Sequence, residues 1–380
     1  MQFSFTDEQE QFRSVIRRFL TDKSPTTEVR RLMETSQGYD RDVWRQLSQE
    51  LALPGIHIPE RYGGAGFGAV ELGIVMEELG RSLLCAPYFS SSVLAANAIL
   101  NAASESQKVE LLPDIASGER LATLAVTEPN GRWDTQGIEL TATLAKDGAG
   151  TEFLLNGVKS FVLDGQIADL LIVVGRNLAT SGDEGLSFFA LPTQTPGVER
   201  RALETMDPTR KLSRIEFRNA RAELLGELGT GARALANTLD QAAIALANEM
   251  VGGAQALFDS AISYVQTRMQ FGRVIGSFQA IKHKCADMLL EVELAKSAAY
   301  YAAEAAAEDD PELPALASLA KACTSDAYMN TAANCIQLHG GIGFTWDHDT
   351  HLWFKRAKSS EVFLGDPSYH RELYVQRSGL

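Results

Sequence analysis

Residues 268–288 of the chain read RMQFGRVIGSFQAIKHKCADM, and residues 337–348 read QLHGGIGFTWDH. A long helix is predicted to start inside the first stretch, running from about Phe278 to Glu308 and stopping before two prolines. A second helix is predicted from Ala315 to Leu338, where Gly340-Gly341 ends it. Long helices with short connections form bundles, so the end of the chain is predicted to be a helical bundle.

The middle of the chain has a different pattern, with short runs of β-branched and aromatic residues bounded by turn residues. Asn156-Gly157 lies between two apolar runs and is typical of a hairpin turn. No helical pattern separates the runs, which favours a sandwich or barrel over a parallel sheet. Strands are predicted at residues 121–127, 138–145, 152–163, 168–174, 186–191 and 213–217.

The start of the chain is again helical. Thr6-Asp7-Glu8-Gln9 fits a capping box, and apolar residues then recur at helical spacing. Further helices are predicted at residues 43–51, 70–81, 90–103 and 107–117. The predicted fold class is therefore α+β and multidomain, with a helical domain at 1–118, a β domain at 119–228 and a helical bundle at 229–380.

The composition excludes several classes of protein. A formal net charge of −14 argues against binding to nucleic acid or to an anionic membrane, because phosphate contacts need clustered Lys and Arg. The four cysteines are scattered without a CxxC pair, so neither a disulfide framework nor a metal site is predicted. The N-terminus lacks the apolar run of a secretory signal, and no apolar stretch is long enough to span a bilayer. A cytoplasmic location is expected.

Six motifs follow one another along the chain in a fixed order. They are PERYGGAGFG at 59–68, TEPNGRWD at 127–134, NGVKSF at 156–161, ELLGELGTG at 223–231, and the two C-terminal stretches quoted above. This series resembles the acyl-CoA dehydrogenase family over nearly the whole chain. The resemblance implies a middle β-barrel and a C-terminal four-helix bundle, with FAD bound between them. It also implies oligomers, an acyl-CoA substrate and electron-transfer flavoprotein as the electron acceptor.

The resemblance assigns five residues to the adenosine and diphosphate end of a neighbouring subunit's FAD. Arg268 and Phe271 belong to the R-x-Q-F-G motif, and Gln337, Gly340 and Gly341 belong to the Q-x-x-G-G motif. Arginine offers charge-assisted donors to a diphosphate, and glycines allow a close approach to the backbone.

The flavin ring of the chain's own FAD is expected beside Thr127 and Phe161. Here the sequence departs from the family, because Arg132-Trp133 replaces a pair of small residues. Leu163 also takes the place of a threonine that hydrogen-bonds the ring in relatives, and leucine cannot donate that bond. The alternative is a subfamily that holds the ring mainly through backbone N–H groups.

The family's reaction is α,β-dehydrogenation of an acyl-CoA thioester, in which a carboxylate removes the α-proton while the β-hydrogen leaves as hydride to the flavin. Relatives carry this base at one of two positions. In this chain the two positions are occupied by Leu364 and Ala242. Both side chains are hydrocarbon, so no catalytic residue is assigned.

Three nearby carboxylates are rescue candidates for the missing base, namely Asp366, Glu361 and Asp240. Each would act only if the backbone path shifted, and a misplacement of about 1 Å can lower a rate on the order of a hundredfold. Asp366 precedes a proline and is typical of a turn or helix cap. Asp240 fits a structural position that relatives also hold with Asp.

Three hypotheses about function follow. The leading one is a non-catalytic partner that completes the FAD site of a related catalytic subunit in an α2β2 heterotetramer, as occurs in relatives that handle bulky CoA esters such as degraded steroid side chains. The runner-up is a self-sufficient FAD-dependent dehydrogenase or oxidase, active as a homotetramer with an unconventional base. The third is a scaffold protein on a retired enzyme fold, because fold alone does not determine function.

Overall fold

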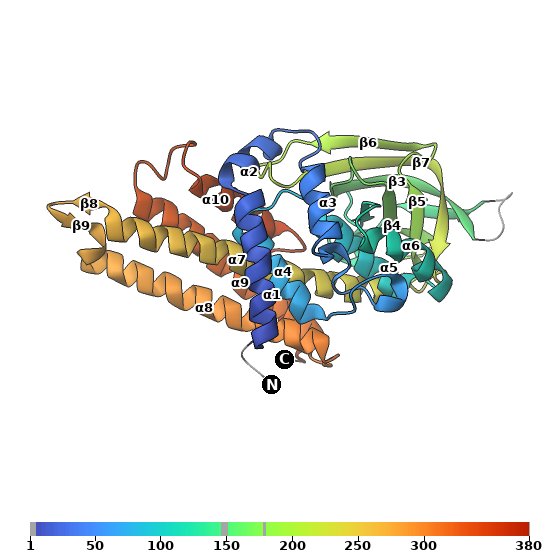
Figure 1. Cartoon of the computed structure of the whole chain (residues 1–380). Helices are drawn as coiled ribbons and strands as arrows, with labels where there is room; N and C mark the ends of the chain where they lie inside the picture. The colour runs from blue at the N-terminus through green and yellow to red at the C-terminus, as the bar shows by residue number, and fades with distance from the viewer. Residues whose placement is uncertain (1–4, 146–150, 178–179, 380) are drawn as a thin grey trace. The chain divides into compact units, whose positions relative to one another are not determined.

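The computed structural model describes residues 5–145, 151–177 and 180–379 (Figure 1). Contacts within the chain define two compact units. The first comprises Met1–Arg31, Gly68–Leu84 and Ala243–Leu380, and the second comprises Leu32–Phe67 and Cys85–Ala242. In the described part of the chain, no helix has the length and apolar character needed to cross a membrane.

The first unit is helical. Its helices are α1 (Asp7–Lys23), α4 (Ala69–Arg81), α8 (Gln279–Ala307), α9 (Leu313–His339), α10 (Thr350–Val362) and α11 (Pro367–Arg377), together with α7 (Gly231–Thr267) from Ala243 onward. α2 (Thr26–Met33) ends just beyond this unit. The core between α7, α8 and α9 is built mostly of alanines, whose small side chains let the helices approach closely. The predicted bundle is confirmed, and Gly340 caps α9 as expected.

α4 and α7 cross within this unit at glycines. A Cβ atom on Gly252 of α7 would lie 1.8 Å from the carbonyl oxygen of Glu77, and one on Gly80 of α4 would lie 2.0 Å from the carbonyl oxygen of Glu249. Only glycine fits where two backbones approach this closely. The side chain of Glu249 also accepts a hydrogen bond from Arg356 of α10 at 2.6 Å, with both side chains buried. The crossing therefore ties α4, α7 and α10 together.

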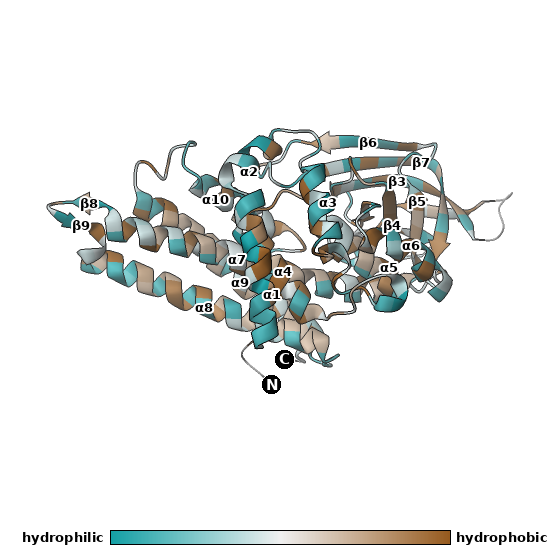
Figure 2. Cartoon of the chain, in the orientation of Figure 1, coloured by the Kyte–Doolittle hydropathy of each residue, from teal (hydrophilic) through white to brown (hydrophobic). Residues whose placement is uncertain are grey.

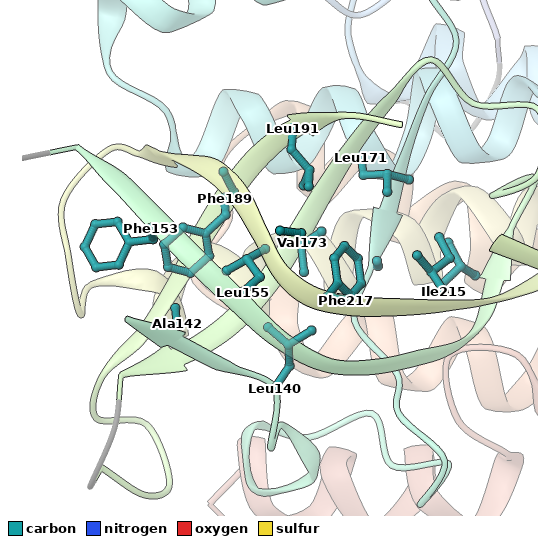
Figure 3. Packing of buried hydrophobic residues seen from close by; sticks show 14 of the residues in the cluster. Leu140, Ala142, Phe153, Leu155, Leu171, Val173, Phe189, Leu191, Ile215 and Phe217 are labelled. Atoms are coloured by element: carbon teal, nitrogen blue, oxygen red, sulfur yellow. The ribbon is translucent and has the colours of Figure 1, made fainter. Parts of the chain in front are cut away.

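The second unit contains the sheet. Its strands are β1 (Ala122–Ala125), β2 (Thr141–Leu144), β3 (Glu152–Leu163), β4 (Leu170–Asn177), β5 (Leu186–Pro192), β6 (Val198–Leu203) and β7 (Leu212–Leu225). The pairing runs β4-β2-β3-β7-β5, and β5 pairs with β4 again, so the sheet closes into a barrel; β1 and β6 add to β4 and β7. Figure 2 shows the hydrophobic character along β4, and Figure 3 shows the apolar side chains that fill the interior. The predicted barrel is confirmed.

Helices complete the second unit. They are α3 (Arg41–Gln49), a π-helical segment (Phe89–Ala95), α5 (Ala96–Ala102) and α6 (Glu105–Ala116). The segment predicted as one helix at 90–103 is thus a π-helical turn followed by α-helix.

The predicted hairpin turn at Asn156-Gly157 is wrong. β2 and β3 pair with Leu144 opposite Phe153, so the chain reverses before Asn156, and β3 continues through both residues. The pairing of β3 with β7 shifts register between Leu155 and Asn156, which marks an irregularity in the strand. Gly157 has a φ of +143°, and a Cβ there would lie 3.0 Å from the Cα of Leu140. Glycine at position 157 therefore allows β3 to pass close to the backbone of Leu140, and it does not form a turn.

A buried ion pair joins two of the sequence motifs inside the barrel. Lys159 on β3 donates to the Oε1 atom of Glu128 at 2.7 Å and to the carbonyl oxygen of Val126 at 2.8 Å. Burial lowers the pKa of Lys159 to about 8, and Glu128 opposes part of that shift. Glu128 also accepts the backbone N–H of Leu140 at 2.9 Å. The TEP and NGVK segments are therefore fixed to each other by a satisfied polar network.

We expect Gly252→Ala to lower the free energy of unfolding by about 3 kcal/mol, because the added methyl group overpacks the crossing of α4 and α7. Urea denaturation measures this change. Gly341→Ala is the matched control, since a Cβ at Gly341 would have no atom within 4 Å, and its effect should stay within about 0.5 kcal/mol. Equal stability of the two variants would contradict the importance of the crossing.

Candidate functional site

The R-x-Q-F-G motif lies where α7 ends. The backbone N–H of Arg268 donates to the carbonyl oxygen of Tyr264 at 2.9 Å, and its own carbonyl oxygen accepts from Ile275 at 2.8 Å. Phe271 sits in the tight turn between β8 (Met269–Gln270) and β9 (Arg273–Val274), with a φ of +52° and 89% of its surface exposed. A bulky residue in the left-handed region is strained, and strain of this kind clusters at functional sites.

The Q-x-x-G-G motif lies where α9 ends. Gly340 has a φ of +62°, and its backbone N–H donates to the carbonyl oxygens of Ile336 and Gln337. A Cβ on Gly340 or on Gly341 would have no atom within 4 Å, and Gln337 is exposed. The packing of the described chain therefore does not require glycine at 341, and the backbone there is open to approach from outside.

Contacts within the first unit bring the two motifs together. The ring of Tyr264 on α7 stacks on the ring of His339 on α9, with centroids 4.3 Å apart, and its hydroxyl donates to the carbonyl oxygen of His339 at 3.3 Å. The imidazole ring of His339 also packs against the ring of His348, with their centroids 4.6 Å apart. The sequence assigned no role to Tyr264, and only its position four residues before Arg268 could have suggested one.

The arrangement fits one end of a dinucleotide. Among the described residues Arg268 has no carboxylate within ion-pairing distance, so its charge is available to a phosphate. Phe271 offers an exposed aromatic face, and the two glycines leave backbone open nearby. In the described ranges, no group of three His, Cys, Asp or Glu side chains could hold a metal ion.

The residues expected beside the chain's own flavin ring lie in the second unit. Thr127 is buried, and its hydroxyl donates to the carbonyl oxygen of Ser160 at 2.9 Å, while the N–H of Ser160 donates back to the carbonyl oxygen of Thr127. Phe161 follows directly, 44% exposed and with a φ of +59°. The structure thus brings Thr127 and Phe161 together, with the threonine hydroxyl already engaged.

Leu163 and the Arg132-Trp133 pair, where the sequence differs from the family pattern, also lie in the second unit. Leu163 is buried, and its carbonyl oxygen accepts the hydroxyl of Thr123 at 2.6 Å. Arg132 forms a bidentate pair with Asp134 two residues away, which holds its guanidinium within its own loop, and Trp133 is half-buried between them.

One of the two expected base positions, Leu364, is fixed in an unusual conformation. Leu364 is 3% exposed and has a φ of +63°. Its carbonyl oxygen accepts from Nε2 of His370 at 3.0 Å, and the carbonyl oxygen of Gly365 accepts from Nζ of Lys321 at 3.0 Å. The buried side chains of His370 and Lys321 therefore hold this backbone in place, and the side chain that it presents is hydrocarbon. Ala242, at the other base position, is fully buried.

The rescue candidates have structural roles or are buried. Asp366 caps α11, because its carboxylate accepts the N–H of Tyr369 at 2.8 Å. Glu361 pairs with Lys358 on the same face of α10. Asp240 is buried on the part of α7 that lies in the second unit.

The imidazole of His370 must stay neutral to keep this arrangement. Burial lowers its pKa to about 4, and the nearby charge of Lys321 adds to the effect. Its Nδ1 atom is buried and has no hydrogen-bond partner in the described structure, which agrees with a ring that carries its proton on Nε2.

We expect His370 to make stability depend on pH. Its pKa is about 4 when folded and about 6.5 when unfolded, so protons bind the unfolded state more readily, and stability is full above pH 6.5 and falls toward pH 4. The loss from this group between pH 7 and pH 5 should be about 2 kcal/mol. In His370→Gln that part of the pH dependence should disappear, as measured by urea denaturation at both pH values.

His283→Gln is the control for this experiment, because His283 is exposed on α8. It should show the pH dependence of the unchanged chain. If His370→Gln also kept the pH dependence of the unchanged chain, the prediction that His370 is buried as a neutral imidazole would be wrong.

Comparison with known proteins agrees with this geometry. The family models "Acyl-CoA dehydrogenase" N-terminal, middle and C-terminal domain match residues 6–119, 123–220 and 229–379. The chain is 31% identical to acyl-CoA dehydrogenase IpdE2 of Mycobacterium tuberculosis, over 95% of this chain and 94% of that protein. It is 30% identical to an acyl-CoA dehydrogenase of Bacillus subtilis, over 96% of each.

Solved structures give the same result. Butyryl-CoA dehydrogenase from Megasphaera elsdenii superposes with a TM-score of 0.92 at 28% identity, with both chains fully covered. A chain of the ChsE4–ChsE5 complex from Mycobacterium tuberculosis has a TM-score of 0.88 at 25% identity, over 100% of this chain and 99% of that one. The Tcur3481–Tcur3483 steroid ACAD has a TM-score of 0.87 at 28% identity, over 98% of each chain.

Proposed function

Because this chain belongs to the acyl-CoA dehydrogenase family, we propose that it is a non-catalytic subunit that completes the FAD site of a related catalytic subunit. The observation that carries the proposal is the buried Leu364 at one base position, with Ala242 at the other. A general base must accept a proton within hydrogen-bond reach of the substrate, and neither side chain has an atom that can do so.

The exposed residues at the ends of α7 and α9 support the part of the proposal in which this chain helps to bind the partner's FAD. Arg268 would bind the diphosphate of the partner's FAD, and Phe271 would pack against its adenosine. The open backbone at Gly340 and Gly341 would allow the diphosphate to approach the N–H groups. FAD bound in this way would supply the hydride acceptor for α,β-dehydrogenation of an acyl-CoA on the catalytic subunit. These residues of the present chain bind and orient, and they move no proton.

Structural neighbours support a heteromeric assembly and a bulky substrate. One neighbour is a chain of the ChsE4–ChsE5 complex, and another is the Tcur3481–Tcur3483 steroid ACAD. By this likeness we propose a heterotetramer acting on a bulky CoA ester such as a degraded steroid side chain. The proposal includes electron-transfer flavoprotein as the electron acceptor and a cytoplasmic location.

The geometry gives less support to a self-sufficient enzyme. Asp366 is engaged as the cap of α11, and Glu361 pairs with Lys358. Moving either carboxylate to the place of Leu364 would break those interactions and the bonds from His370 and Lys321 that fix the loop.

Purification tests the proposal directly. We expect the chain expressed alone to lack flavin absorption in the visible spectrum and to lack acyl-CoA dehydrogenase activity. Co-expression with a related catalytic subunit should restore both. A yellow, active homotetramer formed by this chain alone would overturn the proposal. In that case Asp366→Asn would test the unconventional base, since asparagine still caps a helix but cannot take the proton.

A substitution at the proposed FAD surface gives a second test. In the co-expressed complex, Arg268→Gln should weaken FAD binding about tenfold, because a charge-assisted hydrogen bond to phosphate is lost. Fluorescence of released flavin measures the affinity. Arg18→Gln on the exposed face of α1 is the matched control and should leave FAD binding unchanged. Equal FAD affinities in the two variants would show that Arg268 does not contribute to FAD binding.

A further inference from the structure

We infer that the second unit carries a separate binding site for a small organic carboxylate with an apolar body. A cavity of about 560 Å³ lies between the loop before α3, the turn after β3 and the strands β6 and β7. Its volume falls within the range of ordinary small-molecule sites. None of its lining residues belongs to the flavin or base positions, so the site does not depend on the proposed function.

One side of the cavity is cationic. Arg41, the first residue of α3, is exposed and has no carboxylate within ion-pairing distance among the described residues. Lys211 donates one hydrogen bond, to the carbonyl oxygen of Met33 at 2.6 Å, which leaves two N–H groups of its ammonium. The lining contains no acidic side chain. An anion is therefore the ligand that this wall favours.

Two acidic residues outside the lining act electrostatically on Tyr39, which lines the cavity. The carboxylate of Asp164 accepts the hydroxyl of Ser90 at 2.6 Å, and that of Asp169 accepts the backbone N–H of Leu121 at 3.0 Å. Burial raises the pKa of the Tyr39 hydroxyl, and a hydrogen bond from the neighbouring Arg41 opposes part of that shift. Both carboxylates lie outside the lining, where Arg41 and Lys211 are the charged residues.

Gln166, which also lines the cavity, has a buried donor without a partner among the described residues. The Oε1 atom of Gln166 accepts the hydroxyl of Ser213 at 2.6 Å, which fixes the orientation of the amide. The Nε2 atom is buried, and in the described structure it has no hydrogen-bond partner. Nearly all such atoms in native proteins are paired, so an acceptor on a bound ligand would complete the network.

Another part of the lining is apolar. Ile167, Leu203 and Leu212 line it, with the small side chain of Ala202 at the edge. Inorganic phosphate would leave this surface without contact, whereas a hydrocarbon or aromatic body would cover it. The planar guanidinium of Arg41 matches the geometry of a carboxylate, which it can bind through two parallel hydrogen bonds. Together the two walls specify an organic carboxylate.

Isothermal titration calorimetry with 2-naphthoate on the full-length chain tests the inference, and it needs no flavin. We expect one saturable site. The neutral isostere 2-naphthamide should bind at least about tenfold more weakly, because it cannot form the charge-assisted bonds. Arg41→Gln should weaken naphthoate binding about tenfold, and Ala202→Trp should abolish it by filling the cavity. Arg45→Gln is the control, since Arg45 lies on α3, pairs with Asp42 and does not line the cavity.

Three outcomes would overturn the inference. The first is an absence of saturable naphthoate binding. The second is equal affinity for naphthoate and naphthamide, which would show a purely apolar pocket. The third is naphthoate binding that neither Arg41→Gln nor Ala202→Trp changes, which would place the ligand elsewhere on the chain.

Discussion

The crossing of α4 and α7 is the constraint on which the first unit depends. The two backbones meet at Gly252 and Gly80, where any Cβ would lie within about 2 Å of a carbonyl oxygen. The same turn of α7 carries Glu249, which holds α10 through Arg356. α7 then ends at the R-x-Q-F-G motif, and α10 ends just before Leu364. One close contact between helices thus positions both the proposed FAD surface and the altered base position.

The sequence predicts the long helices closely because their stop signals are local. The predicted helix at 278–308 is observed at Gln279–Ala307, and the one at 315–338 at Leu313–His339, bounded by prolines and by Gly340. The strands are predicted less well. β6 was missed because most of its side chains are exposed, which removes the alternation that marks a half-buried strand. The hairpin at Asn156-Gly157 was wrong because the same residue pair also suits a strand irregularity.

The proposed site residues belong to family motifs, and their physical setting depends on contacts that sequence spacing does not reveal. Tyr264 and His339 are 75 positions apart, yet their stacking joins the two motifs. Lys321 lies 44 positions before Gly365, whose carbonyl oxygen it binds. Neither pairing leaves a periodic signal, because each depends on how helices pack. The cap formed by Asp366 was foreseeable, because an Asp followed by Pro at a helix start is a local pattern.

The geometry around Leu364 shows how the loop at this expected base position is held with a leucine in it. The backbone there is held through carbonyl oxygens, by His370 and Lys321, and neither hydrogen bond involves the side chain of residue 364. A carboxylate buried at this position would need its own partners, and a leucine needs none. A leucine at the expected base position therefore leaves the two hydrogen bonds that hold this loop in place. The proposed FAD surface differs from this loop, because there the side chain of Arg268 itself would bind the neighbour's diphosphate through its charge.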